Sequence, residues 1–281
     1  MRLGGSVMKP YKTPSEWLGH VKELGYSAVI FPVDHTAPKQ LRRDYQKCAQ
    51  DNGLVIAEVG IWKNVMARDA SEQAAAFERS VRQLELAEDI GAECCVNISG
   101  SLGARWDGFH PDQDTRACYE AVVEMTQRII DAVKPTHTKF SLEPMPWMFP
   151  ESPEDYLDLI RDVDRPCFAA HLDYANMINS ISRYRKSGEF IGHCFDVLGE
   201  HILSIHAKDV KIDDGRLPLN INEVPPGQGV IDYGLVLRRA HALGPDTPVV
   251  IEHLPDHEAY MAASRHVLSV AEQAGVPVVH I

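Results

Sequence analysis

The chain has 281 residues, of which 44% are apolar and 24% are charged. These proportions are typical of a folded globular protein and exclude a largely disordered chain. The 28 basic and 40 acidic side chains give a net charge of −12, which opposes binding to phosphate backbones and anionic lipid, so neither nucleic acid nor a membrane is an expected partner.

Short runs of apolar and β-branched residues alternate with helix signals along the whole chain. Strands are predicted over 3–7, 27–31, 54–59, 93–98, 139–143, 167–173, 202–206 and 248–252. A helix is predicted over 15–24, where Thr13 and Pro14 provide a start and Gly25 a stop. Further helices are predicted over 71–90, 112–133, 154–161 and 233–243.

Strict alternation of strand and helix predicts a parallel sheet, because parallel neighbours need a crossover connection that the helix supplies. Eight strand–helix units predict an α/β protein with a closed (β/α)8 TIM barrel. No GxGxxG motif follows the first strand, which argues against an open doubly wound sheet. No linker divides the chain, so one domain is expected over residues 1–281. Two long irregular stretches, 100–111 and 211–229, are candidate lids over the catalytic face.

The cysteines and the opening segment bear on where the protein works. The six cysteines contain no CxxC pair, and their spacing matches neither a zinc module nor a small disulfide framework. The first residues have no apolar signal-peptide core, and no run of about 18 apolar residues occurs. We therefore expect reduced thiols and a cytoplasmic location.

Four successive predicted strands end in side chains that can bind a metal. They are Glu143, Asp173, His206 and Glu252, at separations of 30, 33 and 46 residues, each close to one strand–helix unit. Because the C-terminal ends of barrel strands meet at one face, these side chains should converge. Three converging carboxylates repel one another, and a buried unpaired charge is costly, so a divalent cation is expected between them.

The donor set of three carboxylates and one imidazole, without a thiolate, favours a hard or borderline ion with open coordination positions. Mn²⁺ or Mg²⁺ is therefore the predicted cofactor, Co²⁺ is also compatible, and structural Zn²⁺ is disfavoured. A substrate would chelate at the open positions. Each of the four residues alone is as readily a strand-end cap or an ion-pair partner, so the prediction depends on all four together.

The sequence resembles the xylose isomerase-like TIM barrels, a superfamily of sugar phosphate isomerases and epimerases. The likeness covers most of the chain and is strongest from Ser141 to Leu254. The motifs that carry it are Leu142-Glu143-Pro144, His171-Leu172-Asp173, His206-Ala207-Lys208-Asp209, Pro226-Gly227-Gln228-Gly229 followed by Asp232, and Ile251-Glu252-His253.

The resemblance implies that the four candidate ligands bind one divalent metal and that Glu143 and Glu252 also move protons as the catalytic pair. It implies a sugar, sugar phosphate or related polyol ketone as the small-molecule partner, reacting through a metal-stabilised enediolate. Return of the proton to the opposite face gives epimerisation, and return to the adjacent carbon gives aldose–ketose isomerisation. Expulsion of a leaving group would instead give a keto-sugar or keto-inositol dehydratase or lyase, the alternative among enzymes. Homo-oligomers are typical of the family.

Some positions depart from well-described members of the superfamily. Ketose 3-epimerases carry a histidine where this chain has Asn176 and an arginine where it has Ile212, so 3-epimerisation is not specifically implied. Endonuclease IV, a DNA-repair relative, needs three zinc ions and further histidines, whereas this chain has Asn176, Glu58 and Asn97. An abasic-site endonuclease is therefore disfavoured, and a non-catalytic sugar-binding barrel is a weaker alternative.

Several other residues are candidate substrate contacts, Asn176 among them. Glu58 and Asn97 end the third and fourth strands and can hydrogen-bond hydroxyls, although loop capping is equally open. Lys208, two residues after His206, is a candidate donor to a substrate oxygen or an ion-pair partner of a carboxylate. His171 should lie deeper on the face of Asp173, where it can orient a ligand or fill the core.

Aromatic and glycine residues near the motifs suggest how the substrate is enclosed. Trp147 is a candidate wall for a sugar face, with Trp62 and Trp106 as weaker candidates. His253 should face the helices and is expected to be structural. The turn at 226–229 lies where many barrels bind phosphate, but no lysine or arginine is close within it, so phosphorylated and free sugars both stay open.

Overall fold

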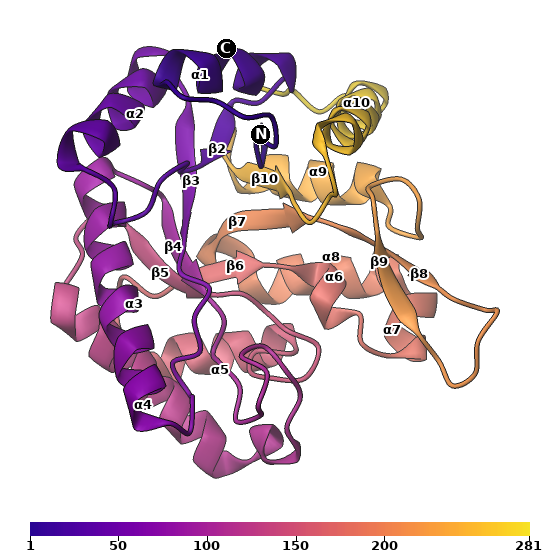
Figure 1. Cartoon of the computed structure of the whole chain (residues 1–281). Helices are drawn as coiled ribbons and strands as arrows, with labels where there is room; N and C mark the ends of the chain where they lie inside the picture. Colours follow the sequence, from indigo (N-terminus) through magenta and orange to yellow (C-terminus); the bar gives the residue numbers. More distant parts are fainter.

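The computed structural model describes all 281 residues and shows a ring of parallel strands surrounded by helices (Figure 1). The wall strands are β1 (Arg2–Gly5), β2 (Ala28–Ile30), β3 (Val55–Gly60), β4 (Cys94–Asn97), β5 (Lys139–Leu142), β6 (Ala170–Leu172), β7 (Ile202–Ala207) and β10 (Pro248–Ile251). The long helices are α1 (Pro14–Glu23), α2 (Lys39–Asp51), α3 (Ala70–Ile90), α4 (Arg116–Val133), α5 (Pro153–Val163), α8 (Ser187–Leu198), α9 (Tyr233–Leu243) and α10 (His257–Gln273). Two short helices, α6 (Tyr174–Met177) and α7 (Ile181–Arg185), follow β6.

The wall strands form two four-stranded parallel sheets, in the orders β1-β10-β7-β6 and β2-β3-β4-β5. A few backbone hydrogen bonds join the sheets at the two seams, such as Ser27 N–H to the Leu3 carbonyl between β1 and β2. The first seam needs a glycine, because a Cβ atom on Gly4 would lie 2.7 Å from the Ala28 carbonyl oxygen. The predicted (β/α)8 barrel is confirmed, although its hydrogen-bond ladder does not run around the whole circumference.

Local sequence signals determine where several helices begin. Thr13 accepts a backbone N–H bond from the first turn of α1, which Pro14 opens, and Ser152 and Pro153 do the same for α5. The apolar faces of the helices pack on the strands in one core cluster of 62 buried residues. This packing fixes the directions in which the side chains at the strand ends point.

The segment after β7 differs from the sequence prediction. An irregular stretch is predicted over 211–229, whereas the structure has an antiparallel hairpin of β8 (Asp209–Ile212) and β9 (Ile221–Val224), which projects beyond the barrel in Figure 1. Both strands contain β-branched residues that favour pairing. The loop over 100–111 is irregular, as predicted. None of the helices combines the length and the hydrophobicity needed to cross a membrane.

Candidate metal and catalytic site

The four candidate ligands meet at the C-terminal ends of the wall strands. Glu143 follows β5, Asp173 follows β6, His206 lies on β7 and Glu252 follows β10. One donor atom of each lies within 4.8 Å of the others. The Nδ1 atom of His206 is 2.6 Å from Glu252 Oε1, 3.4 Å from Glu143 Oε1 and 3.5 Å from Asp173 Oδ2. The structure therefore brings the four residues to a common point.

This cluster is buried and incompletely paired. Asp173 and His206 are fully buried, and Glu143 and Glu252 are only 4% and 8% exposed. Three of the facing atoms, Asp173 Oδ2, His206 Nδ1 and Glu252 Oε1, make close ionic contacts with one another and with Lys208 but no well-oriented hydrogen bond. Such atoms are costly to bury, so their convergence indicates a position for a cation. The oxygen-rich donor set with one imidazole fits a divalent ion such as Mg²⁺ or Mn²⁺.

Lys208, directly after β7, extends its ammonium group into the same cluster. Its Nζ atom donates a hydrogen bond of 3.1 Å to Glu143 Oε1 and lies 2.6 Å from Asp173 Oδ2. It also contacts Glu252 Oε1, although only the bond to Glu143 has hydrogen-bond geometry. Of the two roles considered for Lys208, the ion pair with nearby carboxylates is the one observed. One ammonium balances one of three carboxylates, and the two remaining charges match a divalent ion.

The two glutamates differ electrostatically. Burial raises the pKa of Glu143, and the nearby Lys208 only partly opposes this effect. Burial also acts to raise the pKa of Glu252, but His206 and Lys208 outweigh it and hold that pKa well below the usual range. Lys208 and His206 also lower the pKa of Asp173, although burial acts to raise it. The cluster therefore places two carboxyl groups of unequal proton affinity side by side.

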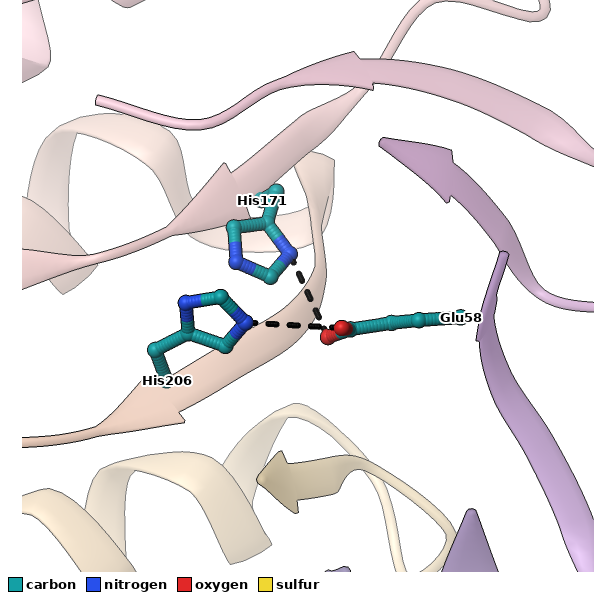
Figure 2. Close-up of side chains that lie close together, drawn as sticks. All are labelled: Glu58, His171 and His206. Atoms are coloured by element: carbon teal, nitrogen blue, oxygen red, sulfur yellow. Dashed lines mark hydrogen bonds and ion pairs between the residues drawn. The ribbon is translucent and has the colours of Figure 1, made fainter. Parts of the chain in front are cut away.

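A second polar group lies on the other side of the His206 ring (Figure 2). Glu58 extends from β3 toward two imidazoles, with Oε2 3.4 Å from His206 Nε2 and Oε1 3.5 Å from His171 Nδ1. The hydroxyl of Ser204 donates to Glu58 Oε1. Burial and the neighbouring His206 lower the pKa of His171 to about 4, so this ring is neutral near pH 7. Glu58 and His171 thus both adjoin a candidate ligand.

The two asparagines predicted as substrate contacts have different surroundings. Asn176 borders the cavity beside the ligands, and its Nδ2 atom donates to Glu143 Oε1 at 3.1 Å and to the Pro144 carbonyl at 3.0 Å. Asn97 is fully buried, and its amide exchanges bonds of 3.0 and 3.1 Å with the Lys63 backbone. Asn97 therefore clamps the loop after β3 and does not face the cavity, because both ends of its amide are used by Lys63.

A cavity of about 610 Å³ adjoins the cluster. Glu58, Glu143 and Glu252 are part of its lining, whereas Asp173 and His206 lie behind it. A volume of this size is typical of small-molecule sites. Two of the four candidate ligands can therefore contact both an ion and a bound substrate.

Three tryptophans line the same cavity, namely Trp62, Trp106 and Trp147. The indole of Trp147 donates a 3.0 Å bond to the Asp107 carbonyl, which ties the loop after β5 to the 100–111 loop. Trp62 has a left-handed backbone, with φ of 52°. Such a conformation is unfavourable for a bulky residue and is concentrated at functional sites. All three aromatic residues considered from the sequence thus border one space.

His253 is oriented differently from the sequence prediction. Alternation along a strand would point it toward the helices, whereas it has a left-handed backbone, with φ of 57°, and borders the cavity. The reason is that β10 ends at Ile251, so alternation stops before His253. Its Nδ1 atom lies 3.1 Å from Glu223 Oε2, which β9 supplies. Sequence reasoning misses Glu223 because the hairpin is not predicted.

The glycine-containing turn after the hairpin is held by a buried aspartate. Asp209 accepts backbone N–H bonds of 2.8 to 3.1 Å from Val210, Gly227, Gly229 and Ile231. The turn passes so close that a Cβ atom on Gly229 would lie 2.1 Å from Asp209 Oδ1. The N–H groups that a phosphate would need are therefore already bonded.

Comparisons with known proteins show to which protein family the chain belongs. The family model described as xylose isomerase-like TIM barrel matches residues 18–271. The chain belongs to this family. None of the curated proteins matches its sequence.

Solved structures share the fold at low sequence identity. A xylose isomerase-like TIM barrel protein from Mycobacterium smegmatis in complex with magnesium has a TM-score of 0.68 at 18% identity, covering 94% of this chain and 90% of that one. D-psicose 3-epimerase from Clostridium cellulolyticum H10 with D-tagatose has a TM-score of 0.71 at 14% identity, covering 98% and 99%. The probable 3-DHS dehydratase AsbF from Bacillus anthracis has a TM-score of 0.71 at 16% identity, covering 96% and 99%. These similarities show a common fold among proteins with different reactions.

Proposed function

We propose that the protein is a divalent-metal-dependent isomerase or epimerase that acts on a free sugar or related polyol ketone. The observation that most supports this function is the arrangement of the two glutamates. Glu143 and Glu252 belong to the four-residue cluster and also line the cavity, whereas Asp173 and His206 lie behind it. Two carboxylates that can touch both an ion and a substrate suit proton transfer next to a carbonyl group.

The four clustered residues would hold the ion, and the donor set favours Mn²⁺ or Mg²⁺. When bound, the ion supplies polarisation of the substrate carbonyl and of the hydroxyl beside it. Asp173 and His206 do not line the cavity, so their role would be only to hold the ion in position. Asp173 is itself held, because its Oδ1 atom accepts the Asn176 N–H and caps α6.

Proton transfer is the work of Glu143 and Glu252. They follow β5 and β10, which belong to different sheets, so they approach the cavity from different parts of the wall. One removes a proton from the carbon beside the carbonyl, and the other returns a proton to it or to the adjacent carbon. Asn176 and Lys208 both donate to Glu143 Oε1, which leaves Oε2 available to the substrate.

The charges around the cavity favour a substrate without phosphate. The Gly227 and Gly229 N–H groups of the 226–229 turn bond to Asp209, and Arg105, which lines the cavity, pairs with Asp107 at 2.9 Å. Trp62, Trp106 and Trp147 offer apolar faces of the kind on which a sugar ring can stack.

Elimination is the second candidate reaction, and the raised pKa of Glu143, which lines the cavity, favours it. Lys208 is 1% exposed and does not line the cavity, so its ammonium group acts only through the carboxylates that it contacts. A carboxyl group that holds a proton beside a proton-abstracting carboxylate can protonate a departing hydroxyl. A keto-sugar or keto-inositol with a leaving group beside the acidified carbon would then be dehydrated.

Incubation with free ketoses, keto-inositols and sugar phosphates in heavy water tests these alternatives. We expect Mn²⁺-dependent incorporation of deuterium into a free ketose without release of water. Release of a leaving group would support the lyase, and turnover of sugar phosphates alone would contradict the free-sugar assignment. Glu252→Gln should reduce turnover by about 10²- to 10⁴-fold, the range for loss of a general acid or base. Binding without turnover in the unmodified protein would indicate a sugar receptor.

A further inference from the structure

Glu58 is a buried carboxylate that takes no part in the proposed proton transfer at the substrate. It is 1% exposed, and no lysine or arginine pairs with it. Its neighbours are the Ser204 hydroxyl, His206 Nε2 at 3.4 Å and His171 Nδ1 at 3.5 Å. A buried ionised group needs hydrogen-bond donors, and because the Ser204 hydroxyl donates to Oε1, Oε2 needs an N–H from His206.

His206 faces two different environments through its two ring nitrogens. Nδ1 points at the cluster of Glu143, Asp173 and Glu252, where an ion would need an unprotonated lone pair. Nε2 points at Glu58 (Figure 2). A neutral imidazole carries only one ring N–H. An N–H on Nε2 serves both environments, whereas the other tautomer would aim a lone pair at Glu58 and a proton at the ion.

The position of Glu58 is itself fixed by the wall. Ser204 lies two residues before His206 on β7, so the two side chains share one face of the strand. Its hydroxyl binds Oε1 and leaves Oε2 toward Nε2. The ring of His171 packs edge-on against that of His206, with centroids 4.0 Å apart, and limits its rotation.

We infer that Glu58 is a positioning residue for the metal centre, accepting the Nε2–H of His206 so that Nδ1 is presented to the cation. This role rests on the proposed function of the four-residue cluster and adds a residue from the opposite side of the barrel. Carboxylates that hold the far nitrogen of a metal-bound imidazole raise its basicity and fix its orientation, and their loss typically weakens metal binding about 10- to 100-fold.

Titration of the metal-free protein with Mn²⁺ by calorimetry tests the inference. We expect Glu58→Gln to bind Mn²⁺ about 10- to 100-fold more weakly than the unmodified protein. Glu88→Gln is a matched control, because Glu88 bonds only to residues 136–138, away from the cluster, and should leave Mn²⁺ affinity unchanged. Ser204→Ala, which removes the hydroxyl that holds Glu58, should weaken binding less. It also provides the test if Glu58→Gln does not fold.

A spectroscopic readout separates positioning from a general loss of structure. In protein labelled with ¹⁵N-histidine and loaded with diamagnetic Zn²⁺, the His206 signals should show the proton on Nε2. In Glu58→Gln this proton should exchange faster or the tautomer should change. A folded Glu58→Gln with unchanged Mn²⁺ affinity and tautomer would overturn the inference and leave the proposed function intact. Two ions per chain, one of them lost in both Glu58→Gln and His171→Asn, would overturn it in favour of a second metal site. An unmodified protein without Mn²⁺ affinity would overturn both proposals.

Discussion

Two buried aspartates near the ends of β6 and β7 have opposite surroundings. Asp209 is fully buried and accepts four backbone N–H bonds, so its charge is shared among donors of its own loop. Asp173 is equally buried, but its Oδ2 atom lies among other carboxylates, accepts no backbone N–H and is paired only with the shared ammonium of Lys208 and with His206. Burial alone therefore does not distinguish a structural carboxylate from a functional one. The distinction comes from whether the acceptor atoms are satisfied within the fold.

Asp173→Asn should give the larger effect on ligand binding. The loss of a direct ligand charge should weaken Mn²⁺ binding by more than the roughly 10- to 100-fold expected for an outer partner. The ion-free protein should also lose stability, because Lys208 and His206, which hold the pKa of Asp173 low, lose a buried partner. Asparagine can still keep the cap of α6.

Calorimetry and thermal unfolding with and without Mn²⁺ measure these effects. An ion at 100 times its dissociation constant stabilises the unmodified protein by about 2.7 kcal/mol. That gain should disappear in Asp173→Asn at the same concentration. An unchanged Mn²⁺ affinity would remove Asp173 from the metal centre.

Asp209→Asn is the same chemical change with the opposite expected outcome for Mn²⁺ binding. An amide has one accepting oxygen and turns N–H groups toward the N–H donors of the turn, so about 2 to 4 kcal/mol of unfolding free energy should be lost. Urea denaturation measures this loss, and hydrogen exchange should accelerate at Gly227, Gly229 and Ile231. Mn²⁺ affinity should stay unchanged. A loss of Mn²⁺ binding without a loss of unfolding free energy would contradict the proposed difference between the two aspartates.

Sequence patterns predict the barrel and the candidate ligands because both depend on regular local structure. The alternation of strands and helices fixes the topology, and residues that end successive parallel strands must meet at one face. His206 and Glu252 come together for this reason although 46 residues separate them. The barrel is confirmed, and the metal and catalytic roles of the four residues stay proposals.

Other features depend on irregular backbone that a periodic pattern does not encode. His253 lies beyond the last residue of β10, where a left-handed conformation reverses its expected direction. Glu223 reaches the cavity through a hairpin that forms within a stretch predicted to be irregular. Glu58 is a candidate from the sequence, but its proximity to His206 depends on how side chains cross the barrel interior. The reaction type depends on contacts around a substrate, which no spacing of residues defines.

Substitution of Glu88 should give the smallest effect on stability. The pH dependence of that effect tests the contrast between carboxylates satisfied by the backbone and Asp173. It lies near the end of α3 and accepts the Thr136 hydroxyl and the N–H groups of Thr136, His137 and Thr138. Burial acts to raise its pKa, but these bonds outweigh burial and lower the pKa of Glu88 to about 2, compared with about 4.3 in an unfolded chain. Like Asp209, it is a carboxylate satisfied by the backbone.

Because the folded pKa is lowered, the stabilisation from Glu88 is complete above about pH 4.3 and is lost as the pH falls toward 2. Glu88→Gln should therefore reduce the unfolding free energy by about 1 to 2 kcal/mol at pH 7, and this difference should shrink at pH 3. Urea denaturation of both proteins at pH 7, 4 and 3 measures the trend. A difference that stays constant over this range would show that the charge of Glu88 is not what the 136–138 segment binds. The stabilising effect of Glu88 would then come from hydrogen bonds that do not need its charge, and the contrast with Asp173 would have to rest on Asp209 alone.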